Sequence, residues 1–146
     1  MIATMPSIVT YWYKYSHEGL DIDLVNDEES MAGHFLYILH GKTPSDLHRK
    51  VMDVSLILYA EHEFNASTFT ARVCASTMSD IHSCVVAAIG SLRGPLHGGA
   101  NEKAMELIEN WTSKEEAKSK IIEMLSNKEK IMGFGHAVYS IRDPRN

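Results

Sequence analysis

The sequence predicts an all-α protein. Apolar residues recur at helical spacing along most of the chain, and serine or asparagine residues that can cap helices precede several of these stretches. Glycine or proline follows them as a stop signal. A strand is also compatible with residues 84–89, but the length of the surrounding apolar pattern favours a helix.

The first part of the chain contains three predicted helices. Residues 1–15 are apolar and aromatic, and we expect a buried helix there and not a targeting peptide. Asn26 or Asp27 is predicted to cap the next helix, which Gly41 ends. Ser45 is predicted to cap the third. The apolar stripe of this third helix widens at its centre, so we expect it to be buried on several sides.

The second part is also predicted to be helical. Residues 66–92 are rich in small side chains that allow helices to approach closely, and Gly94-Pro95 ends this stretch. Helical spacing returns over residues 101–111, and Ser113 opens a capping-box pattern for a last helix. The spacing breaks at residues 131–136, where glycines on both sides of an aromatic predict a shaped loop.

Composition limits the class of protein. The chain has 146 residues, 45% apolar and 23% charged, which is typical of a folded globular domain. The net charge of -5, with dispersed basic residues, argues against nucleic acid or an anionic membrane as partner. No apolar run approaches the length of a membrane span. Cys74 and Cys84 lack metal-site spacing and no secretory signal is present, so we expect two free, buried thiols in a cytoplasmic protein.

Three histidines stand in unusual sequence surroundings. His62 lies in a polar interruption of an apolar helix, where buried polar groups need partners. His97 lies in a glycine-rich turn at the predicted entry to a helix, where backbone N–H groups favour negative charge. His136 follows the glycine loop, and Arg145 comes soon after it. The other histidines are interpreted as structural.

These residue types suit carbonyl chemistry on a carboxylic acid. Neutral imidazoles donate hydrogen bonds to a developing oxyanion, and a guanidinium binds a carboxylate through two parallel bonds. A metal site is the competing interpretation, because histidine is a common ligand. His62-Glu63 is not followed by a second histidine at the zinc-protease spacing, and no other histidine pair has short ligand spacing. The residues alone do not name a reaction.

At these residues the sequence resembles the citrate synthase family. Residues 61–68, residues 94–101, and the pair formed by 133–136 and 143–145 look like three central motifs of that family, in order. The resemblance runs along essentially the whole chain and corresponds to roughly the middle two-fifths of a family member. It implies an all-helical fold with a large and a small domain, of which only the central part is present. Residues 1–96 would belong to the large domain and residues 97–146 to the small one.

The resemblance also implies roles. Members of the family condense an acyl-CoA with oxaloacetate and hydrolyse the thioester, with the coenzyme A thioester as co-substrate and no tightly bound cofactor or metal. His97 would donate to the thioester carbonyl, and His136 would polarise and then protonate the oxaloacetate carbonyl. His62 and Arg145 would hold oxaloacetate. The loop facing coenzyme A would comprise Ile131, Met132, Gly133, Phe134 and Gly135.

The family's third catalytic group, an aspartate, belongs to a C-terminal segment that this chain lacks. Asp143 is not that residue, because it belongs to the third motif. We therefore expect these 146 residues alone to be inactive. Family members form homodimers through helices of the large domain, and residues 66–92 are the candidate for part of that interface, with packing inside one chain as the alternative.

One departure bears on the substrate. Many family members carry a basic residue four positions after the loop histidine, where this chain has Ser140, and methylcitrate synthases often have a small hydroxyl residue there. Together with the Tyr-Ala-Glu-His-Glu-Phe-Asn sequence at residues 59–65, this favours propionyl-CoA over acetyl-CoA as the substrate. The alternatives are a citrate synthase that uses acetyl-CoA, a non-catalytic helical module that retains the motifs, and a histidine metal protein.

Overall fold

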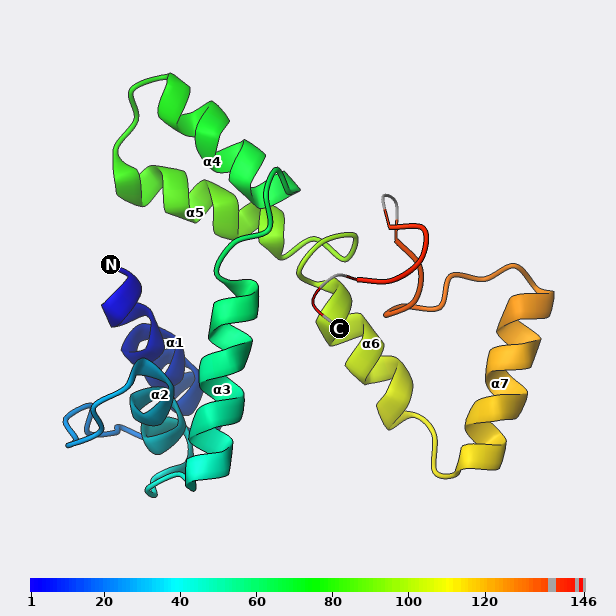
Figure 1. Ribbon diagram of the computed structural model, residues 1–146, viewed down its shortest axis with the longest axis horizontal. Helices are drawn as coiled ribbons and strands as arrows, with labels where there is room; N and C mark the ends of the chain where they lie inside the picture. The colour runs from blue at the N-terminus through cyan, green and yellow to red at the C-terminus, as the bar shows by residue number, and fades with distance from the viewer. Residues whose placement is uncertain (137–138, 144, 146) are drawn as a thin grey trace. The chain divides into compact units, whose positions relative to one another are not determined.

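The computed structural model describes residues 1–136, 139–143 and 145, and every regular element in these ranges is a helix, as predicted (Figure 1). Pro144 of the third motif lies outside the described residues. The chain divides into two compact units, Met1–His62 and Glu63–Asn146. The predicted division of the complete fold at residues 96 and 97 concerns domains of a larger protein and stays a prediction.

The first unit is built on α1 (Met5–Tyr13), α2 (Met31–His40) and α3 (Asp46–Tyr59). A short 3-10 helix, η1 (Ile2–Thr4), precedes α1, and a π-helical turn, η2 (Lys14–Glu18), follows it. Helix α2 packs against both α1 and α3. The small core of the unit contains Thr10, Ala32 and Ile38.

The N-terminus of α2 differs from the prediction. Ser30, not Asn26 or Asp27, is the N-cap, and its hydroxyl accepts a hydrogen bond from the Gly33 amide at 2.9 Å. Asn26 is unavailable because its side chain contacts the Glu28 amide and the His34 ring. The predicted stop is confirmed, since Gly41 has the left-handed backbone (φ 66°) that ends many helices.

Helices α1 and α3 are helical as predicted, but the expectation that they are buried is wrong for this chain. In α1, Ile8 is 57% and Trp12 67% exposed. In α3, whose N-cap is Ser45 as predicted, Leu47 is 68% and Ile57 73% exposed. Apolar periodicity identifies the face of a helix that packs, but what covers that face depends on other segments.

The second unit begins with two helices, α4 (Ala66–Ser76) and α5 (Ile81–Leu92), which pack side by side as an antiparallel pair (Figure 1). The small-residue stretch is thus two helices, and the strand alternative at 84–89 is wrong. Met78, with a φ of 63°, lies in the turn between them, and Asp80 caps α5. Cys84 is buried as predicted, whereas Cys74 is half-buried; both are free thiols.

Two further helices follow, α6 (Ala100–Glu109) and α7 (Lys114–Ser126). Ser113 caps α7 as predicted by accepting from the Glu116 amide at 3.2 Å. The Glu116 carboxylate reaches Thr112, one residue before the cap, where it accepts from the backbone N–H at 2.9 Å and from the hydroxyl at 2.7 Å. None of the described helices is long and apolar enough to cross a membrane.

Candidate active site

His97 is held by Ser67, which lies near the start of α4. The Nε2 atom of His97 is 2.9 Å from the Ser67 hydroxyl oxygen, and the Ser67 backbone N–H donates to the same Nε2 atom at 3.3 Å. Both residues are half-buried. Sequence analysis identified His97 but not its partner, although Ser67 belongs to the first motif.

These contacts select one form of the His97 ring. A backbone N–H has a fixed direction and is only a donor, so the nitrogen it faces must carry a lone pair. The neutral His97 ring therefore carries its proton on Nδ1 in this arrangement. A neutral ring of this tautomer presents an N–H donor on the side opposite Ser67, which is the group needed to stabilise a developing oxyanion.

Asn65 fixes the position of Ser67. As the N-cap of α4, its side-chain oxygen accepts from the Thr68 amide at 2.9 Å and contacts the Ser67 hydroxyl at 2.7 Å. The Ser67 hydroxyl has one proton to share between the Asn65 oxygen and the His97 ring. The start of α4 and the His97 turn are thereby joined through a chain of side-chain hydrogen bonds.

The turn that carries His97 requires glycine because of close backbone approach. The Gly99 amide donates to the Leu92 carbonyl at 3.0 Å, which folds the turn back onto the end of α5. A Cβ atom on Gly99 would lie 2.2 Å from the Arg93 carbonyl oxygen, and one on Gly98 would lie 2.5 Å from Leu92 Cδ1. Both glycines have to stay glycine for the turn to close in this way.

His136 has a comparable local arrangement. Its Nδ1 atom accepts from the Tyr139 backbone N–H at 3.0 Å, and the two rings stack with centroids 4.0 Å apart. Since Nδ1 is an acceptor, the neutral ring carries its proton on Nε2. His136 is exposed, and the Tyr139 contact was not anticipated from the sequence.

Arg145 is paired with Asp143. The guanidinium donates to the two carboxylate oxygens at 2.9 and 2.6 Å, and the Arg145 amide donates to Asp143 at 2.9 Å. Both side chains are about a quarter exposed, at 27% and 26%. A paired aspartate fixes the direction of the guanidinium plane, which is a common way to prepare an arginine for a planar anion.

The remaining predicted residues occupy the loop and the first unit. Residues 131–135 form an irregular loop, in which Gly133 and Gly135 have φ values of 91° and 79° and Phe134 is 79% exposed. His62 is half-buried and is the last residue of the first unit, whereas His97, His136 and Arg145 belong to the second. Among the described residues, no group of three or more histidine, cysteine, aspartate or glutamate side chains could hold a metal ion.

The profile of the family described as "Citrate synthase, C-terminal domain" matches residues 1–146. The chain belongs to the citrate synthase family. It is 65% identical over 146 residues to a 2-methylcitrate synthase of Shewanella oneidensis, covering all of this chain and 39% of that protein. It is 46% identical over 145 residues to a citrate synthase of Synechocystis, covering 99% of this chain and 36% of that protein.

Solved structures of the citrate synthase family agree with the fold. It superposes on the citrate synthase of Thermoplasma acidophilum, solved as a ternary complex with carboxymethyl coenzyme A and oxaloacetate, with a TM-score of 0.88 and 32% identity over 98% of this chain and 38% of that chain. The citrate synthase of Thermotoga maritima gives a TM-score of 0.80 at 42% identity, covering 96% of this chain and 38% of that one. The chain thus spans about two fifths of the length of the relatives that it matches.

Proposed function

We propose that this chain forms part of an enzyme that condenses an acyl-CoA with oxaloacetate and then hydrolyses the thioester of the product with water, which releases free coenzyme A. The observation that carries the proposal is the His97 arrangement, a neutral imidazole held by Ser67 with its donor on Nδ1. Family membership and the names of the relatives give the reaction class. The Thermoplasma enzyme, solved with a coenzyme A analogue and oxaloacetate, supports the same pair of substrates.

His97 acts on the acyl-CoA in this proposal. As a base removes the α-proton of the acyl group, negative charge develops on the thioester oxygen. The His97 Nδ1–H donates to that oxygen, and Ser67 holds the ring in the orientation and tautomer that this requires. The family's catalytic aspartate would be the base, supplied from outside this chain.

His136 acts on oxaloacetate. Its Nε2–H donates to the ketone oxygen, which gains negative charge as the enolate carbon attacks the carbonyl carbon. The Nε2 proton is then transferred to that oxygen, so the former ketone carbon of the product carries a hydroxyl group. The Tyr139 amide, which points at Nδ1, favours the tautomer that this step needs.

Arg145 and His62 bind oxaloacetate in this scheme, and residues 131–135 face coenzyme A. The Asp143 carboxylate already occupies one edge of the Arg145 guanidinium, so the substrate carboxylate would bind at another edge. The positive φ values of Gly133 and Gly135 suit a loop that offers backbone groups to a ligand.

Propionyl-CoA is the proposed acyl donor. The 2-methylcitrate synthase relative is 65% identical, whereas the citrate synthase relatives named above are 46% and 42% identical. Ser140 stands where many family members carry a basic residue, and this also favours propionyl-CoA. The energetic margin is small, because one methylene in a pocket is worth only about 1–3 kcal/mol of discrimination.

We further propose that the complete protein is a homodimer with α4 and α5 at the interface. Both helices present large apolar side chains to solvent, including Phe69 (64% exposed) and Val86 (67%). Exposed apolar groups on neighbouring helices are typical of surfaces that a partner covers. Sedimentation of the full-length gene product tests this part, and a stable monomer would contradict it.

The test of the roles compares variants of the full-length gene product in a coenzyme A release assay. His97→Gln is expected to lower kcat by about 10²-fold or more, as for loss of an oxyanion donor. His136→Gln is expected to lower it by about 10²–10⁴-fold, as for loss of a general acid. His48→Gln is the control, because this histidine is exposed on α3 and belongs to neither the candidate site nor the proposed interface. Equal activity of all variants would contradict the roles, and the 146 residues alone are expected to be inactive.

A further inference from the structure

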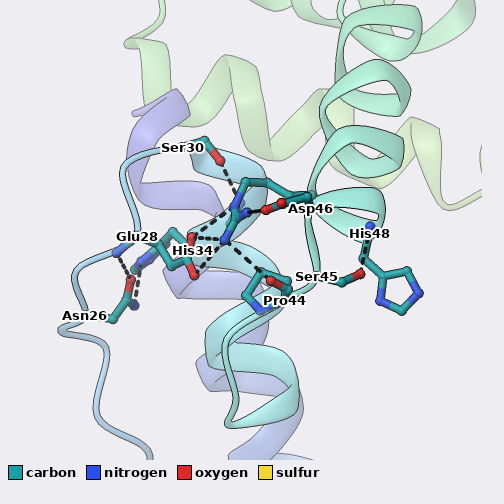
Figure 2. Close-up of polar contacts among 10 residues, drawn as sticks. Asn26, Glu28, Ser30, His34, Pro44, Ser45, Asp46 and His48 are labelled. Atoms are coloured by element: carbon teal, nitrogen blue, oxygen red, sulfur yellow. Dashed lines mark hydrogen bonds and ion pairs between the residues drawn. The ribbon is translucent and has the colours of Figure 1, made fainter.

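Residues 20–30, here called the strap, connect η2 to α2 without regular secondary structure. The strap is held against helices α2 and α3 by two clusters of side chains, both drawn in Figure 2. One cluster joins Asn26 to His34 of α2, and the other joins Glu28 to Arg49 of α3. Neither cluster belongs to the candidate active site.

His34 bridges the strap and α1. Its Nδ1 atom is 2.9 Å from the Asn26 side-chain nitrogen, and its Nε2 atom is 2.9 Å from the Ser7 hydroxyl oxygen. The ring is half-buried. It is therefore the group through which the strap, α2 and α1 are joined by side-chain hydrogen bonds.

The orientation of the Asn26 amide is fixed by a second contact. Its oxygen accepts from the Glu28 backbone N–H at 3.1 Å, so its NH₂ group faces His34. An NH₂ group only donates, and the His34 Nδ1 atom must therefore be an unprotonated acceptor. The proton of the neutral ring lies on Nε2, where it can be donated to Ser7.

The charged groups around His34 are already matched to one another. Both Glu28 oxygens accept from Arg49 at 3.0 to 3.2 Å, and Asp46 accepts from Arg49 at 2.8 Å. The hydrogen bonds of Glu28 raise the pKa of Arg49, which stays charged. Glu28 is thus committed to Arg49, and its carboxylate side chain is only 11% exposed.

We propose that His34 is an acid-sensitive latch for the strap. Protonation adds a hydrogen to Nδ1, which then faces the Asn26 NH₂ group, so that two donors oppose each other. Turning the amide over relieves this conflict but removes the acceptor of the Glu28 N–H. Either way the Asn26 anchor is lost when the ring is protonated, and the strap opens from α2 in acid.

Hydrogen–deuterium exchange of the full-length gene product tests the latch. Exchange of the strap amides is compared at about pH 7.5 and about pH 5.5, after correction for the intrinsic pH dependence of exchange. The native protein is expected to lose protection at the Glu28 amide, which donates to Asn26, by roughly 5- to 30-fold at the lower pH, as for the loss of one or two hydrogen bonds. Unchanged protection would overturn the proposal.

Three variants make the result specific. His34→Gln removes the titrating group, and its strap protection is expected to be independent of pH. Asn26→Asp keeps a side-chain oxygen that accepts from the Glu28 amide, and its second carboxylate oxygen can accept from the protonated ring. In this variant we expect the loss of strap protection at low pH to disappear or reverse. His48→Gln is the control, since this exposed ring points away from the cluster in Figure 2, and it should release like the native protein. Acid release that persists in either of the first two variants would overturn the proposal.

Discussion

Ser67 and His97 lie 30 residues apart in the sequence, and two groups of Ser67 meet the same ring nitrogen of His97. The backbone N–H, 3.3 Å away, determines that this nitrogen is an acceptor, and the hydroxyl oxygen lies 2.9 Å from the same nitrogen. The catalytic proposal for His97 depends on this relationship, because it determines which nitrogen carries the proton.

Removing the Ser67 hydroxyl is expected to slow the reaction without preventing substrate binding. Ser67→Ala keeps the backbone N–H, so His97 should keep its tautomer but lose orientation. We expect kcat of the full-length gene product to fall roughly 5- to 30-fold, with little change in KM for oxaloacetate. Ser76→Ala in the same helix is the control, since the exposed Ser76 hydroxyl donates to the Val73 carbonyl within that helix. An unchanged kcat in Ser67→Ala would show that the Ser67 hydroxyl is not needed to orient His97.

Arg145 is expected to tolerate lysine poorly. Lysine keeps the charge but lacks the planar fork that holds Asp143 and, by proposal, a substrate carboxylate. KM for oxaloacetate should rise by about tenfold or more in Arg145→Lys. Arg142→Lys, at an exposed position in the same segment, should leave KM unchanged. Equal KM values for the two variants would argue against carboxylate binding by Arg145.

Gly33 is expected to reject a methyl group. A Cβ atom there would lie 2.3 Å from the Glu28 carboxylate, so Gly33→Ala must displace Glu28 from its place beside α2. We expect a loss of about 1–3 kcal/mol, seen as a lower melting temperature. Gly90→Ala in α5 is the matched control, because no atom of the described residues lies within 4 Å of a Cβ atom at that position and alanine favours helix. A Gly33→Ala protein as stable as Gly90→Ala would show that the Glu28 position is wrong.

The Asp80 cap predicts a loss of α5 stability in acid. The Ser83 hydroxyl, which donates to the carboxylate at 2.6 Å, and the Ser83 amide lower the pKa of Asp80 below its ordinary value. The folded state therefore holds its proton less tightly than the unfolded state. The contribution is complete above the unfolded pKa of about 3.9 and is lost as the pH falls through the lower folded value.

Asp80→Asn separates this effect from general acid unfolding. Asparagine caps helices about as well as aspartate but does not titrate. Thermal melts at falling pH should show a smaller acid-induced loss in the variant than in the native protein. Identical pH profiles would mean that ionised Asp80 does not support the folded state.

The sequence was sufficient for features determined by neighbouring residues. The caps Ser45 and Ser113 and the stop at Gly41 depend on contacts within a few positions, and each was predicted. The cap of α2 was missed because Asn26 and Ser30 are both good caps by sequence. The contact of Asn26 with His34 removes it from capping, and that contact follows only from the fold.

The candidate site shows the same division. Glycine-rich and polar motifs identified His97 and His136, but not the contacts that fix their tautomers. Ser67 reaches His97 only because the turn after α5 folds back on itself. The exposure of Trp12 and Ile57 could likewise not be predicted from the apolar spacing, which indicates an apolar face but not what covers it.

The most direct test of the central claim is coenzyme A release by the full-length gene product, supplied with oxaloacetate and either propionyl-CoA or acetyl-CoA. We predict release with both and a higher kcat/KM for propionyl-CoA. A preference for acetyl-CoA would correct the acyl donor and leave the roles of His97 and His136 intact. Release with neither thioester would contradict the proposal that this chain forms part of an acyl-CoA-condensing enzyme.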